Sequence, residues 1–232
     1  MNVLCVIPAR GGSRGLKNKN ILPFFGKPLI FYTIKAAGES KLVNKVVVST
    51  DSFRIGLVAK KYNTQVIERP QKYATDRAPI ELALRHAVEY LSKKEGYSAD
   101  IVVWLQANIP IRKKGQVDNV VRRLINSEAD SAVTVYRATQ FPQWMKRMHK
   151  NGYLCPLFKN TDKYRRQDME QMYLLDGAIV AVRTEVLMGT KDKSGAHLFM
   201  GKKVLGIIQE EKYTVEVDEK ESFNLAKFYF RK

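Results

Sequence analysis

Residues 3–16 read VLCVIPARGGSRGL, and this stretch decides the class of fold. Residues 3–7 form a continuous apolar run with the length of a buried strand. A glycine-rich turn that contains Arg10 and Arg14 follows at once. Strands that are apolar on both faces are typical of parallel sheets covered by helices. The turn fits neither the G-x-x-x-x-G-K-S/T phosphate loop nor the G-x-G-x-x-G fingerprint, which argues against mononucleotide kinases and dinucleotide dehydrogenases.

Strand-like and helix-like segments alternate along the rest of the chain. Apolar β-branched runs predict strands at 46–48, 65–68, 101–105, 131–136, 177–182 and 204–208, with a further short strand at 214–217. Apolar residues at helical spacing predict helices at 28–37, 53–62, 80–91, 117–125 and 220–230. This alternation implies right-handed crossovers and a mostly parallel sheet between two helical layers, which is a three-layer α/β fold.

The stretch 138–172 breaks the alternation, because it carries many charges and no sustained period. We interpret it as an insertion that projects from a single domain spanning 1–232. Aromatic residues and methionine favour protein interfaces, so Trp144 is expected to anchor one. The large apolar residues of the insertion are Phe141, Trp144, Met145, Met148 and Phe158.

Composition and charge bound the class of protein. A hydrophobic content of 45% supports a sizeable core and excludes a disordered chain. The net charge of +17 fits a nucleic-acid binder, an enzyme with anionic substrates or an ordinary solvated surface. No apolar run approaches the roughly 18–20 residues of a membrane span. The N-terminus has no basic region before its apolar stretch, so it is not a signal peptide, and a cytoplasmic protein is predicted.

Seven short motifs occur in a fixed order along almost the whole chain. They lie at 7–16 (IPARGGSRGL, with KNI at 19–21), 49–52 (STDS), 69–76 (RP and ATD), 105–112 (LQ and PIR), 166–167 (RQ), 176–179 (DGAI) and 216–218 (EVD). Together they resemble the acylneuraminate cytidylyltransferases, the CMP-sialic acid synthetases and their relatives that activate other nonulosonic acids. Kdo cytidylyltransferases usually lack the glycine pair of the first loop, so the resemblance is greater to the sialic branch.

This resemblance implies a Rossmann-like nucleotidyltransferase fold and an enzyme that uses CTP and Mg²⁺. The anomeric hydroxyl of an acidic sugar would attack the α-phosphate and give a CMP-sugar and pyrophosphate. Such transfers mainly need positioning and charge neutralisation, which suits Arg10 and Lys19 as catalytic residues together with Asp218. The nucleotide-binding residues implied are Ala9, Arg10, Gly11, Gly12, Ser13, Arg14, Lys19, Asn20, Arg69 and Gln106.

The metal ligands implied are Glu216 and Asp218. Two residues apart on a short strand, their carboxylates would point to one face and hold one magnesium ion. Taken alone, such a pair equally fits a solvated edge strand. A third acidic residue often found in the family is replaced here by Ser222.

The sugar-binding residues implied are Asn108, Arg166, Gln167 and Asp176, and this half of the site departs from the family pattern. QPTSPLR becomes QANIPIR at 106–112, and NGAIY becomes DGAIV at 176–180. Asp176 would add a charge facing an anionic substrate. Ile109 and Val180 replace polar groups, which favours deoxygenated sugars such as legionaminic-type acids.

Two other functions remain open at this stage. One is a nucleotidyltransferase of the same fold with another NTP, a sugar-phosphate or Kdo as substrate. The other is a nucleic-acid-binding protein, which only the positive charge supports, since no recognised RNA-binding module is visible. The leading hypothesis predicts no nucleic acid and no membrane partner. Because members of the resembled family commonly dimerise through an insertion at this point, it also predicts a homodimer formed through 138–172.

Overall fold

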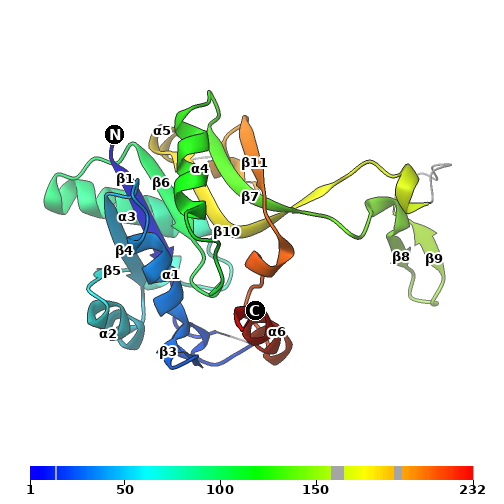
Figure 1. Ribbon diagram of the computed structural model, residues 1–232, viewed down its shortest axis with the longest axis horizontal. Helices are drawn as coiled ribbons and strands as arrows, with labels where there is room; N and C mark the ends of the chain where they lie inside the picture. Colours follow the sequence, from blue (N-terminus) through cyan, green and yellow to red (C-terminus); the bar gives the residue numbers. More distant parts are fainter. Residues whose placement is uncertain (14, 158–164, 191–194, 232) are drawn as a thin grey trace.

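A computed structural model describes residues 1–13, 15–157, 165–190 and 195–231 of the chain. A seven-stranded sheet runs through its centre in the order β11-β7-β10-β6-β1-β4-β5 (Figure 1). The strands are β1 (Val3–Pro8), β4 (Lys45–Thr50), β5 (Gln65–Glu68), β6 (Ile101–Leu105), β7 (Ser131–Arg137), β10 (Tyr173–Arg183) and β11 (Val204–Ile208). The predicted strands at 65–68, 101–105 and 204–208 are confirmed residue for residue.

Helices cover both faces of this sheet, as the three-layer prediction requires. They are α1 (Leu29–Gly38), α2 (Phe53–Lys61) and α4 (Gln116–Ile125) on one face, and α3 (Ile80–Glu95) and α5 (Thr184–Gly189) on the other. Helix α6 (Lys220–Phe230) packs instead on a separate apolar cluster around Phe24. The short α5 was not predicted. Among the described residues, no helix combines the length and the apolarity that crossing a bilayer requires.

The sheet has a hydrophobic core on each face, and strand β1 supplies side chains to both of them. Cys5 and Ile7 are fully buried in the core under α1, α2 and α4, whereas Leu4 and Val6 are fully buried in the core under α3 and α5. Alternate side chains of a strand point to opposite faces, so an unbroken apolar run is what a strand covered on both sides needs. The interpretation of 3–7 as a buried central strand is confirmed.

The sheet is mostly parallel, with β10 as the exception. Strand β10 pairs antiparallel with both β6 and β7, whereas β1 pairs parallel with β4 and β6, and β11 pairs parallel with β7. The β7–β10 register shifts between Leu175 and Val180, so residues 176–179 bulge out of the ladder. Bulges often re-aim side chains next to functional sites. This bulge contains the DGAI motif.

The described residues of the stretch 138–172, which are 138–157 and 165–172, form an arm that projects from the end of the sheet (Figure 1). At its base the amide of Ala138 donates to the carbonyl of Met172, at 2.9 Å. Its far end carries a hairpin of β8 (Lys146–Met148) and β9 (Leu154–Pro156). A projecting insertion was expected, and the structure shows one.

The predicted strand at 214–217 does not form. The segment pairs with no strand of the sheet, and a backbone link to the sheet region runs from the Val217 amide to the Asn108 carbonyl, at 2.9 Å. Val215 and Val217 are instead buried against Phe24 of the small β2–β3 hairpin (Pro23–Phe24 and Lys27–Pro28) and Ala226 of α6. Apolar alternation here reflects burial under a helix and not sheet pairing.

From β1 the chain crosses over to β4 on one side, and from β5 it crosses back to β6 on the other side of β1. In open α/β sheets, ligands bind beyond the carboxyl ends of the strands at such a switch point. The glycine-rich turn follows β1, and Gln106 follows β6, so both lie at this point.

Candidate active site

The glycine-rich turn is held at both ends by backbone contacts. At its start, the Gly11 amide donates to Oδ1 of Asp51 at 2.8 Å. At its end, the Leu16 amide donates to the carbonyl of Asp218 at 3.0 Å. Gly15 lies so close that an added Cβ would be 2.3 Å from that carbonyl oxygen. The turn therefore bridges the end of β4 and the segment that carries the predicted metal ligands.

A cavity of about 240 Å³ opens beside this turn, and we call it the glycine-loop cavity. It brings together residues from four separate motifs of the sequence. Predicted site residues in its lining are Arg10, Lys19, Asn20, Arg69, Gln106, Asn108 and Glu216. Asn108 was assigned to the sugar, yet it lies here. Arg14, assigned to the nucleotide, lies outside the described residues.

Arg69 provides a buried cation in this cavity. Its side chain is 4% exposed, and a terminal nitrogen lies 3.7 Å from Oδ1 of Asp51. Burial lowers the pKa of Arg69, Asp51 opposes the shift, and nearby Arg10 adds to it. Two guanidinium nitrogens of Arg69 have no hydrogen-bond partner. A buried donor without an acceptor is costly, so the cavity is suited to a ligand rich in acceptors.

The two predicted metal ligands meet on one amide. Nδ2 of Asn108 lies 3.2 Å from Oε1 of Glu216 and 3.0 Å from Oδ1 of Asp218. Gln106 donates to the same oxygen of Glu216. The same-face prediction therefore holds although the strand does not, since one amide group reaches both carboxylates.

The chemistry of this carboxylate pair fits a divalent cation. Burial and the neighbouring charge of Asp218 raise the pKa of Glu216. Two hard oxygen ligands that repel each other would gain from a magnesium ion between them, with water and phosphate oxygens completing its shell. Within the described part of the chain, no group of three potential metal ligands occurs. Ser222, which replaces the third acidic residue, instead accepts from the amides of Asp218 and Glu219 and helps to cap α6.

Both predicted catalytic cations have acidic partners. Arg10 forms an ion pair with Asp76, and Lys19 forms one with Asp218. Lys19 and Asp218 are 199 positions apart in the chain, so this pair joins the glycine-rich turn to the C-terminal segment. A bound triphosphate would take the place of Asp76 and Asp218 as the anionic partner of Arg10 and Lys19. A bound metal ion would take the place of Lys19 as the cationic partner of Asp218.

A second cavity, of about 250 Å³, shares Trp104, Gln106 and Glu216 with the first, and we call it the Asp176 cavity. Asp176 does not present a free carboxylate to it. Its Oδ1 accepts from Thr134 at 2.5 Å and from the Ala178 amide at 2.8 Å, and its Oδ2 accepts from Gln209 at 2.8 Å. The rest of the lining is Val133, Thr134, Leu175, Gly177, Val180, His197 and Met200.

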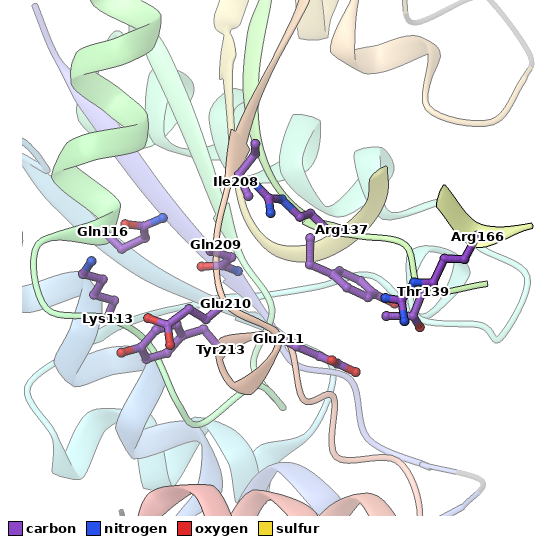
Figure 2. A pocket seen from close by; sticks show the side chains of 11 residues that line it. Lys113, Gln116, Arg137, Thr139, Arg166, Ile208, Gln209, Glu210, Glu211 and Tyr213 are labelled. Carbon is purple, nitrogen blue, oxygen red and sulfur yellow. The ribbon is translucent and has the colours of Figure 1, made fainter. Parts of the chain in front are cut away.

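The third and largest cavity, of about 590 Å³, lies at the base of the arm. Figure 2 shows Lys113 and Gln116 on one side of it and Thr139 and Arg166 on the other. Arg166 is therefore separated from the two cavities above, and Gln167 is exposed next to it. Within one chain, the structure does not bring these two predicted sugar-binding residues to the Asp176 cavity.

Sequence reasoning missed several residues of the site. Trp104 was not among the predicted site residues, but it lines both inner cavities. Thr75 lies within the ATD motif and Tyr73 just before it; neither was assigned a role, yet both line the glycine-loop cavity. His197 was not assigned to the site either, and it lines the Asp176 cavity. Ile109 is a correction of the opposite kind, since it is fully buried in the core and is not available to a sugar.

Comparison with known proteins agrees with this geometry. A family model described as "Cytidylyltransferase" matches residues 4–189. The chain is 30% identical over 225 residues to an N-acylneuraminate cytidylyltransferase of Escherichia coli, a match that covers 97% of this chain and 51% of that protein. It is 32% identical over 196 residues to a CMP-N,N'-diacetyllegionaminic acid synthase of Legionella pneumophila, covering 82% of each.

Solved structures show the same fold. A CMP:2-keto-3-deoxy-manno-octonic acid synthetase complexed with CTP superposes with a TM-score of 0.74 at 19% identity, covering 100% of this chain and 99% of that one. A 4-diphosphocytidyl-2C-methyl-D-erythritol synthase from Anaerococcus prevotii gives 0.68 at 14% identity, with the same coverage. The predicted nucleotidyltransferase fold is confirmed.

The chain belongs to the cytidylyltransferase family of nucleotidyltransferases, as predicted. It spans about half the length of the E. coli relative.

Gly15→Ala tests the contact between the turn and the metal segment. The new Cβ would meet the Asp218 carbonyl, so we expect weaker CTP binding, by about tenfold or more, because small misplacements of binding groups are costly. Calorimetric titration with CTP and Mg²⁺ measures this. Gly38→Ala is the matched control, since a Cβ there has nothing within 4 Å and should leave binding unchanged. Equal affinity in both variants would contradict the role of the contact.

Proposed function

We propose that this protein transfers CMP from CTP to the anomeric hydroxyl of an acidic nonulosonic sugar and releases pyrophosphate. One observation carries the proposal: three cations meet a pair of carboxylates at the glycine-loop cavity. Arg10, Lys19 and Arg69 line it together with Glu216, and Asn108 in the same lining joins Glu216 to Asp218. Family membership supports the nucleotide, and relatives named for sialic, pseudaminic and legionaminic acids support the acceptor class.

In this proposal the glycine-loop cavity holds the nucleotide. Arg10 and Lys19 contact the triphosphate, where fixed charges stabilise the transition state of phosphoryl-type transfer without reorganisation. Arg69 uses its unpartnered nitrogens on the nucleotide. Glu216 and Asp218 would hold Mg²⁺, which neutralises charge on the phosphates when bound. Asn108 keeps both carboxylates aligned, as supporting groups around metal ligands do.

The Asp176 cavity holds the acceptor in this proposal. It adjoins the glycine-loop cavity through Gln106 and Glu216, so a sugar there would lie next to the α-phosphate. Its apolar wall of Val133, Val180 and Met200 suits a methyl group better than a hydroxyl. We therefore propose a deoxygenated sugar of the legionaminic type.

A pyrophosphate-release assay tests both parts of this function. Four NTPs are crossed with N-acetylneuraminic, legionaminic and pseudaminic acids and Kdo. We expect turnover with CTP alone, and a kcat/KM for legionaminic acid about 5- to 150-fold above that for N-acetylneuraminic acid, since an unpaired buried hydroxyl costs roughly 1–3 kcal/mol. A tenfold preference for N-acetylneuraminic acid would contradict the acceptor, and turnover with another NTP would contradict the nucleotide.

Asp218→Asn tests the metal role. The substitution keeps the shape and an oxygen for Asn108, but it removes the charge that a cation needs. We expect turnover to fall by about a hundredfold or more and not to recover at high Mg²⁺, as measured with the same assay. Glu211→Gln, on an exposed acidic residue outside the two inner cavities, is the control and should retain full activity. Full activity of the Asp218 variant would remove the metal assignment.

We further propose that the arm pairs two copies of the chain into a homodimer. Met148, Tyr153 and Leu154 of the arm are 69%, 74% and 61% exposed, an apolar area that a projecting hairpin does not bury by itself. Phe141 does not add to this area, because it is buried against Trp144. Phe158, also assigned to the interface, lies outside the described residues. The cytoplasmic location stays a prediction.

Light scattering at assay concentration tests the dimer. The unaltered chain should have twice the mass of one copy, and Met148→Lys should shift it toward a monomer because a charge at an apolar interface is costly. Leu57→Lys on α2, an exposed leucine of the body, should not change the mass. An unaltered chain that is monomeric and fully active would exclude the proposal.

A further inference from the structure

Arg112 presents a charge inside the protein that the proposed mechanism does not use. It follows β6 on the loop that carries Gln106 and Asn108. Its hydrogen-bond partners among the described residues are all neutral oxygens. They are the carbonyls of Gln106 (2.6 Å), Ala178 (3.3 Å) and Ile109, and the hydroxyl of Thr33 (2.9 Å). Carbonyls stabilise a guanidinium but do not cancel its charge.

The guanidinium lies directly behind the walls of the two inner cavities. Gln106 lines both cavities, and Ala178 follows Gly177, which lines the Asp176 cavity. The backbone of Ala178 also connects Arg112 to an acidic side chain. Its carbonyl accepts from Arg112, and its amide donates to Asp176 at 2.8 Å. A buried cation and a carboxylate therefore lie on either side of one residue in the β10 bulge.

Asp176 is the anion that faces this cation. Cys5 is also close to Arg112, but burial raises the pKa of its thiol to about 12, so it is uncharged at neutral pH. Arg112 also lines a small separate cavity with Glu39, Lys113, Lys114 and Asp118, and none of these four residues lines the two inner cavities. Burial lowers the pKa of Arg112 to about 10, and Cys5 and Asp176 oppose the shift. Arg112 therefore keeps its proton at neutral pH. The three groups that bond to Asp176 directly are a hydroxyl, an amide and a carboxamide, none of which carries charge.

We propose that Arg112 is a positioning residue whose partly buried charge offsets that of Asp176, so that an anionic acceptor can occupy the Asp176 cavity. Without Arg112, the carboxylate of Asp176 would repel the carboxylate of the sugar across this cavity. Low local dielectric strengthens such repulsion. The inference rests on the proposed function and adds to it the means by which an aspartate is tolerated beside an acidic substrate.

A double-mutant cycle tests this charge balance with Arg112→Gln, Asp176→Asn and the double variant. We expect Arg112→Gln to raise the KM for the acidic sugar by on the order of tenfold, with a smaller change in kcat, and Asp176→Asn in the same chain to restore most of that loss. A role in packing alone would give no such rescue, so KM losses that simply add would overturn the proposal. Arg85→Gln is the matched control, because Arg85 is buried and, like Arg112, bonds to neutral oxygens, which are the Leu187 carbonyl and the Thr190 hydroxyl. The KM of the Arg85→Gln variant for the acidic sugar should not change when Asp176→Asn is added.

Thermal unfolding of the same variants gives a readout that does not depend on the reaction. If the two charges balance, Arg112→Gln lowers the melting temperature more in the chain with Asp176 than in the chain with Asn at that position. Equal losses would overturn the proposal. If the unaltered chain turns over no acidic sugar, the proposed function fails, while this stability cycle still decides whether the two charges are coupled.

Discussion

The site depends on the close approach of the glycine-rich turn to the backbone of Asp218. A hydrogen bond of 3.0 Å from Leu16 and the absence of a side chain at Gly15 permit it. The turn begins where β1 ends, and the Asp218 segment lies at the other end of the chain. Their contact brings Lys19 to Asp218 and closes one side of the cavity between them. A Cβ at Gly15 would push these two parts of the molecule apart.

The amides around this contact explain how so much charge is accommodated. Asn108 donates to both Glu216 and Asp218, and Gln106 donates to Glu216. These donors reduce the cost of placing two carboxylates side by side, and the neighbouring lysine reduces it further. Behind them, Arg112 binds the carbonyls of the same loop. Neutral amides therefore hold the two carboxylates, and neutral oxygens hold Arg112, whereas Arg10 and Lys19 are held by acidic partners.

Strand β10, which contains the bulge, differs from the other strands of the sheet in its direction. Strand β10 runs antiparallel to its neighbours, so its N-terminal half lies near the carboxyl ends of β6 and β7. The chain enters it from the arm, which leaves from the end of β7. The connection from β7 through the arm to β10 therefore brings the arm, the Asp176 cavity and the nucleotide side of the site into one region of the molecule. The site accounts for only part of the net charge of +17, since many of the basic residues lie elsewhere on the surface.

The sequence by itself determined most strands of the central sheet, most helices and the family, because apolar periodicity records which faces are buried and the motifs keep a fixed order. Fully apolar runs such as 3–7 and 101–105 have only one stable place, in a sheet covered on both sides. Only the tertiary structure decided which side chains share a cavity. It placed Trp104 at the site, Ile109 in the core and Arg166 away from both inner cavities. It also showed that 214–217 is held by α6 and not by a strand. These outcomes depend on contacts between residues far apart in the chain, about which local periodicity carries no information.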